Sequence, residues 1–90
     1  MRVDSASSAV TADVYCEIDT RIAAAHARYG EFASTHEALG VACEEWDELR
    51  DAIRSNSMPD VERECIDLAA VLIRLARDLR GSHTKKRSTK

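Results

Sequence analysis

Aromatic residues and proline are scarce in this 90-residue sequence, which has 4% aromatic residues and one proline. Stable β-sandwiches and barrels rely on aromatic and β-branched strands separated by turn residues, so this scarcity favours helices. With 44% hydrophobic and 32% charged residues, the chain falls in the globular range rather than the disordered one. A chain of this length cannot bury two cores. We therefore predict one all-α domain.

The sequence also lacks a long apolar run. No segment approaches the roughly 18 to 20 apolar residues that a membrane-spanning helix requires. The first five residues lack the charged-then-apolar order of a secretory signal. We expect a cytoplasmic protein with no membrane partner.

Cysteine is present as an odd number of residues, at Cys16, Cys43 and Cys65. Each lies inside an apolar periodic segment, so a disulfide framework is not expected. The default expectation for such cysteines is a buried free thiol.

Lysine is absent outside the last nine residues, 82–90, and the remaining body carries nine arginines against 16 acidic residues. A body this acidic would be repelled by phosphate backbones, so we do not expect nucleic acid as a partner. The short basic end has nothing to bury. We therefore expect a folded domain over 1–81 and a disordered basic tail over 82–90.

Periodicity and punctuation divide the domain into three helical segments. The first covers about residues 8–28 and is ended by Gly30. Ser34, with a glutamate three residues later, fits a capping box that opens the second segment. Pro59 suits the first turn of a third helix, which we expect to end at Gly81. The apolar stripe of the second segment is Leu39, Ala42, Trp46, Leu49 and Ile53.

The third segment is too apolar for a surface helix, because its hydrophobic residues spread well beyond one stripe. Two other helices of similar length cannot cover it completely, and chains of this size usually need help to reach useful stability. We therefore expect a homo-oligomer, a dimer or larger, in which helices from two chains complete a bundle.

Acidic residues gather at two places that an antiparallel helix pair would bring together. Glu45 and Glu48 share one helical face, and Glu64 and Asp67 share another. Four carboxylates converging beside an apolar helix raise one another's pKa unless a cation compensates them. Magnesium takes oxygen ligands and commonly links protein carboxylates to substrate phosphates. The cluster therefore suggests a phosphate ester or anhydride as substrate.

These motifs carry a family resemblance. The stretches HEALGVACEEWDELRDAIR and ERECIDLAAVLIRLARDL contain EExxE and ExxD. They resemble the MazG-like all-α nucleoside triphosphate pyrophosphohydrolases, and most of all the short phage-encoded members. The resemblance implies a three-helix chain forming a MazG-like helical bundle completed by oligomerisation, in the host cytoplasm if phage-encoded. It also implies magnesium-dependent hydrolysis, with manganese as an alternative, of an NTP or dNTP to the monophosphate and pyrophosphate.

Carried over by position, the resemblance makes Glu45, Glu48, Glu64 and Asp67 the metal ligands. Glu44 would be the catalytic group that orients or deprotonates the attacking water, or a further ligand. Family members commonly continue into a further helix after ExxD. We therefore expect that part of the nucleotide pocket is either missing or supplied by a neighbouring subunit.

Substrate phosphates would have to meet arginines, because the body contains no lysine. Arg74 lies seven residues after Asp67 on the same helical face, so it is the best placed. His36 is a second candidate for substrate binding, as a base or a phosphate contact, although a histidine in a first helical turn is more often a surface or capping residue.

Two other readings remain open. One is a catalytically inactive oligomer of the same fold that binds nucleotides or nucleotide signals. The other is an interaction module whose acidic residues are simply solvated. The motifs name neither the base nor the sugar of a substrate.

Overall fold

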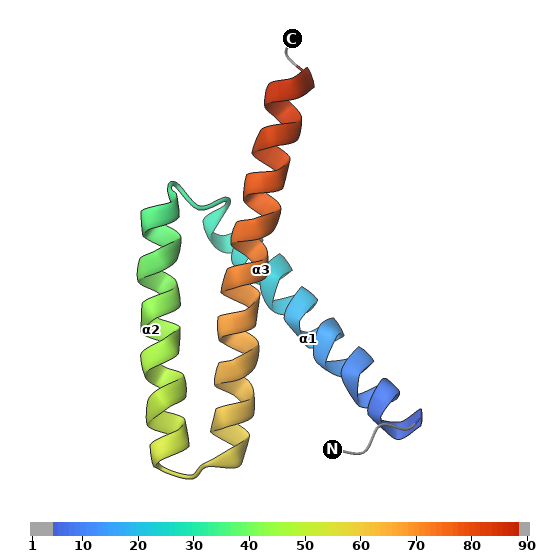
Figure 1. Cartoon of the computed structure of the whole chain (residues 1–90), viewed down its shortest axis with the longest axis vertical. Helices are drawn as coiled ribbons and strands as arrows, with labels where there is room; N and C mark the ends of the chain where they lie inside the picture. Colours follow the sequence, from blue (N-terminus) through green and yellow to red (C-terminus); the bar gives the residue numbers. More distant parts are fainter. Residues whose placement is uncertain (1–4, 89–90) are drawn as a thin grey trace.

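The computed structural model of the chain describes the backbone of residues 5–88 and the side chains of residues 8–82. The described part consists of three α-helices, α1 (Ser5–Tyr29), α2 (Thr35–Arg54) and α3 (Met58–Ser88), and it contains no strand. Helices α2 and α3 lie side by side and antiparallel, and α1 crosses α3 obliquely (Figure 1). The prediction of an all-α chain with three helices is confirmed. None of the described helices is both long and apolar enough to cross a membrane.

The start of α2 is fixed by its N-cap. The Oγ atom of Ser34 accepts a hydrogen bond from the Glu37 backbone N–H at 3.1 Å. The Glu37 carboxylate in turn accepts from the backbone N–H of Ala33 at 2.9 Å, one residue before the cap itself. One unpaired donor of the helix start, the Glu37 N–H, is therefore satisfied together with the Ala33 N–H just before the cap, and the predicted capping box is present in this shifted form.

The connection between α2 and α3 is tight. Helix α2 ends at Arg54, and Asn56 has a positive φ of 55° that reverses the chain. Asparagine tolerates this left-handed conformation better than most residues. Pro59 lies in the first turn of α3, where its missing N–H has no helical partner to lose. This short hairpin makes α2 and α3 antiparallel, as the sequence predicts.

Helix α3 continues through Gly81 to Ser88, so the helix end expected at Gly81 is wrong. A glycine ends a helix when it adopts a left-handed conformation. Gly30 does so with a φ of 72° at the end of α1, whereas Gly81 is not among the described residues with positive φ. The side chains of residues 83–90 lie outside the described part of the chain, so the basic tail stays a prediction there.

Helix α3 is the central element, since it packs against both α1 and α2, and in the described part of the chain α1 and α2 do not pack on each other. The α1–α3 core is the cluster Ile18, Ile22, Ile66 and Ala70, flanked by Val14 and Ala69. The N-terminal half of α1 extends away from the other helices (Figure 1), which leaves Val10 and Tyr15 exposed.

The face of α2 that packs on α3 agrees with the predicted apolar stripe only in part, at the buried Leu49 and the half-buried Ala42. Ala38, Leu49 and Ala52 are the buried residues of α2. Trp46, by contrast, is 54% exposed, and Leu39 and Ile53 are exposed as well. The small alanines let α2 approach α3 closely on this side, so the bulkier residues are turned outward. The sequence prediction gave more weight to the larger hydrophobic residues, so it placed Leu39, Trp46 and Ile53 on the packed face.

The three cysteines are free and exposed, so the expectation of buried thiols is wrong. Cys16, Cys43 and Cys65 each lie in a helix, but on a side that neither of the other helices covers.

The capping geometry gives the first prediction. Replacing Ser34 with alanine removes the acceptor for the Glu37 N–H and should lower the free energy of unfolding by about 1 kcal/mol. Ser34→Asp is the matched control, because aspartate caps a helix as well as serine does. Urea unfolding followed by circular dichroism checks both variants. Equal destabilisation of the two would contradict a capping role.

Candidate metal-binding site

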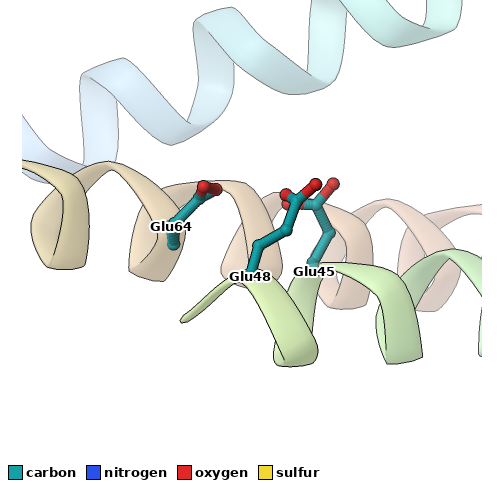
Figure 2. Close-up of side chains that lie close together, drawn as sticks. All are labelled: Glu45, Glu48 and Glu64. Carbon is teal, nitrogen blue, oxygen red and sulfur yellow. The ribbon is translucent and has the colours of Figure 1, made fainter. Parts of the chain in front are cut away.

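Three glutamates form an acidic cluster between α2 and α3. Each of Glu45, Glu48 and Glu64 offers a carboxylate oxygen, and these oxygens lie within 4.8 Å of one another. Figure 2 shows the Glu45 and Glu48 side chains rising from α2 and that of Glu64 from α3, with all three carboxylates directed to the side where α1 passes. We call this group the glutamate triad.

The triad forms because Glu45 occupies a position on the packed face of α2. Its neighbours on that face are Ala38 and Leu49, which are buried, and Val41, which is half-buried. Glu45 and Glu64 are half-buried, whereas Glu48 is exposed. Two glutamates one turn apart on α2 therefore meet a glutamate of α3 across the hairpin.

Like charges and burial dominate the surroundings of Glu45 within the triad. Burial, and then repulsion from the carboxylates of Glu48 and Glu64, raise the pKa of Glu45 above its ordinary value. Glu45 Oε2 and Glu64 Oε1 are buried oxygens without a hydrogen-bond partner. Buried acceptors of this kind are costly, so the arrangement fits a cation that would bind both oxygens.

Asp67, the fourth predicted metal ligand, is not part of the triad. Its carboxylate forms an ion pair with the Arg21 guanidinium of α1. Arg21 also contacts Glu17 at 3.3 Å. Sequence reasoning missed Arg21, and the only available signal was its place beside Ile18 and Ile22 on the apolar side of α1.

A cavity of about 270 Å³ adjoins the triad at Glu45. All three helices line it, and its charged lining residues are Arg21, Glu45, Asp67 and Arg74. A second cavity of about 530 Å³ has Glu45 and Arg74 in its wall too, together with Glu44 and Phe32. The two cavities are neighbours, since Tyr29 and Val41 also line both.

Arg74 stands between the two cavities. It is only 8% exposed, and its Nη2 donates a hydrogen bond to the Gly30 carbonyl at 2.9 Å. Its guanidinium lies 3.9 Å from the centre of the Phe32 ring, and its Nε is buried without a partner. Arg74 and Asp67 line the same cavity, as their sequence spacing predicts. A contact from Arg74 to substrate phosphate stays a prediction.

The two remaining candidate residues, Glu44 and His36, differ in whether they line a cavity beside the triad. Glu44 is exposed and lines the second cavity beside Glu45. His36 is exposed in the first turn of α2 and lines neither cavity. The geometry therefore brings Glu44 to the site but does not bring His36 there.

No similar protein is found. Comparison of the chain with models of protein families gives no match, and neither does comparison with curated proteins or with solved structures. The resemblance to the MazG-like pyrophosphohydrolases therefore rests on the EExxE and ExxD motifs. What the structure adds is the meeting of Glu45, Glu48 and Glu64 in space.

The repulsion within the triad gives the second prediction. Because the folded-state pKa of Glu45 is raised, ionised Glu45 weakens the metal-free fold at neutral pH, and this penalty disappears as the pH falls below the unfolded-state pKa of about 4.3. Glu45→Gln should therefore raise the melting temperature at pH 7 in chelator, and its advantage should vanish in acid.

The matched control is Glu62→Gln, which removes an exposed charge from α3 outside the triad. Thermal melts from pH 3 to pH 8 compare the variants. A lower melting temperature of Glu45→Gln at pH 7, or an equal rise in the melting temperature of Glu62→Gln, would contradict the claim that repulsion within the triad destabilises the fold.

Proposed function

We propose that this protein is a magnesium-dependent nucleoside triphosphate pyrophosphohydrolase that acts on an NTP or dNTP. The observation that carries the proposal is the glutamate triad, in which three carboxylates from two helices approach within 4.8 Å and two of their oxygens are buried without partners. The MazG-like resemblance of the same residues, most of all to short phage-encoded members, supplies the reaction.

The donor set fits magnesium. Carboxylate oxygens are the ligands that this hard cation prefers, and manganese accepts the same set. Glu45, Glu48 and Glu64 would hold the ion, and Asp67, one turn after Glu64, would join them as the fourth carboxylate. The ion would neutralise phosphate charge and polarise a phosphoryl oxygen.

The chain's own residues would then bind and orient the reactants. Arg74 faces both cavities and would bind a phosphate group through its guanidinium. Glu44, beside Glu45 in the second cavity, would hold the attacking water and accept its proton. Water adds to the α phosphorus as the anhydride bond between the α and β phosphates breaks, which releases monophosphate and pyrophosphate.

Oligomerisation is part of the proposal, with a second copy of this chain as the partner. The core of the single chain is small, and large apolar side chains remain exposed on α3 and α2. Burial of such residues drives association of helical chains. The exposed residues in question are Leu72, Ile73 and Leu79 of α3 with Leu39 and Trp46 of α2. The homo-oligomer would be cytoplasmic, in the host cytoplasm if the protein is phage-encoded.

A catalytically inactive oligomer that binds nucleotides is the second candidate. The observation that favours it is the ion pair between Asp67 and Arg21, which leaves only three of the four expected ligands together. In this reading the arginines beside the cavity hold the nucleotide, and no hydrolysis follows.

The third prediction tests turnover. With magnesium and a panel of ribo- and deoxynucleoside triphosphates, the protein should release pyrophosphate and the matching monophosphate. Glu48→Gln and Asp67→Asn should abolish release while the helical circular dichroism signal is kept, because each removes a ligand without removing core packing. Glu62→Gln, outside the triad, should retain full activity. Nucleotide binding without hydrolysis would favour the second candidate.

The fourth prediction concerns assembly. Sedimentation velocity at micromolar concentration should show a dimer or larger species. Leu72, which is 53% exposed on α3, should be part of the contact, so Leu72→Lys should shift the protein toward monomer. The matched control Ala24→Lys, at an exposed position of α1, should leave the assembly intact. A compact wild-type monomer would overturn this part of the proposal.

A further inference from the structure

Among the described side chains of α1, Arg21 forms an ion pair with a predicted metal ligand, Asp67. It reaches across from α1 to Asp67 on α3, and both residues line the cavity that adjoins Glu45. The Arg21 side chain keeps 35% of its surface exposed and that of Asp67 keeps 28%. Neither is sealed in the core, so the pair can separate without unfolding the helices.

The position of this pair sets up a competition. Asp67 follows Glu64 by one helical turn and lines the same cavity as Glu45, while its carboxylate is held by Arg21. A divalent cation on the triad would attract the Asp67 carboxylate more strongly than a single guanidinium does. Ion pairs that remain partly exposed contribute little to stability, so exchanging this one for a metal contact is not opposed by the fold.

The Arg21 guanidinium, once released from Asp67, would remain in the wall of a cavity. Arg21 and Arg74 line the same cavity of about 270 Å³. Arg74 is more than nine-tenths buried there, and its Nε has no hydrogen-bond partner. Two arginines facing one small cavity suit a phosphate group, because guanidinium groups bind phosphate oxygens in a bidentate manner.

We propose that Arg21 is an internal counterion of Asp67 which the divalent cation displaces, and that the freed guanidinium then binds a substrate phosphate together with Arg74. This inference rests on the proposed function and extends it, since it makes Arg21 of α1 a phosphate-binding residue. It also gives a role to the ion pair that holds Asp67 outside the triad. Metal binding and substrate binding are thereby coupled through one side chain.

Removing the Arg21 charge should strengthen the binding of Mn²⁺ and weaken the binding of the nucleoside triphosphate. In Arg21→Gln, Asp67 is free, so Mn²⁺ without nucleotide should bind about fivefold more tightly than it does to the wild type. With Mn²⁺ saturating, the KM for the nucleoside triphosphate that the wild type hydrolyses fastest should rise about tenfold, as expected for a lost charged hydrogen bond. A residue that only held α1 in place would not produce this opposition.

Two further variants sharpen the test. Arg77→Gln removes a second described ion pair between α1 and α3, in which Arg77 lies 3.5 Å from Asp19, and should change neither Mn²⁺ affinity nor KM. Arg21→Lys keeps the charge, so its Mn²⁺ affinity should stay near the wild-type value. Its KM should still rise, because lysine cannot make the bidentate contact.

The experiment is Mn²⁺ titration by calorimetry, followed by steady-state kinetics, with circular dichroism to check helicity. Unchanged or weaker Mn²⁺ binding in Arg21→Gln, or an unchanged KM, overturns the role of Arg21 and leaves the proposed function standing. If the wild type has no saturable Mn²⁺ site that Glu48→Gln removes, the proposed function itself fails, and the role of Arg21 fails with it.

Discussion

Repulsion among three carboxylates at the α2–α3 contact is the interaction on which the account of this protein depends. The face of α2 that packs on α3 contains Glu45 in a row of small apolar residues, and α3 presents Glu64 opposite it. A fold selected only for stability would place apolar side chains there, since partly buried like charges oppose packing. The hairpin between Arg54 and Met58 holds the two helices antiparallel, and this keeps the half-buried Glu45 and Glu64 on facing sides of the helix pair.

Arginines of α1 and α3 connect the other parts of the chain to the region of the triad. Arg21 links α1 to Asp67, one turn from the triad. Arg74 holds the α1–α2 connection, through the Gly30 carbonyl and the Phe32 ring. The Phe32 backbone N–H is also held by Asp78 at 3.0 Å. Helix α3 therefore contacts both the acidic site and the α1–α2 connection, whose residue Phe32 lines the larger of the two cavities.

Local signals made much of this predictable from the sequence. The capping serine, the turn before Pro59 and the spacing of Glu45 and Glu48 each act over a few residues, and the antiparallel hairpin that follows from them brings Glu64 to the same place. The sequence predicted the packed face of α2 only in part, at Leu49, because the buried Ala38 and Ala52 carry little hydrophobic weight. The partner of Asp67 is 46 residues away in the chain, and only the crossing of α1 over α3 brings Arg21 to it. The predicted end of α3 at Gly81 was wrong for a different reason, since a glycine permits a helix to end but does not require it.

The exposed apolar residues fit the same account. Trp46 and Leu72 lie on the outer sides of α2 and α3. The inner sides contain buried alanines, the half-buried Glu45 and Glu64, and the buried Arg74. A second chain would supply the burial that a single chain lacks, and it would lie next to helices that carry the site.

The most direct test of the central claim is the melting temperature of the protein in magnesium compared with sodium chloride at the same ionic strength. A cation that binds only the folded state stabilises it by about 2.7 kcal/mol at a hundredfold excess over Kd. The account predicts a rise in melting temperature with magnesium that matched salt does not reproduce and that Glu48→Gln abolishes. An equal response to both salts would show that the three glutamates are merely solvated, and the metal site would have to be abandoned.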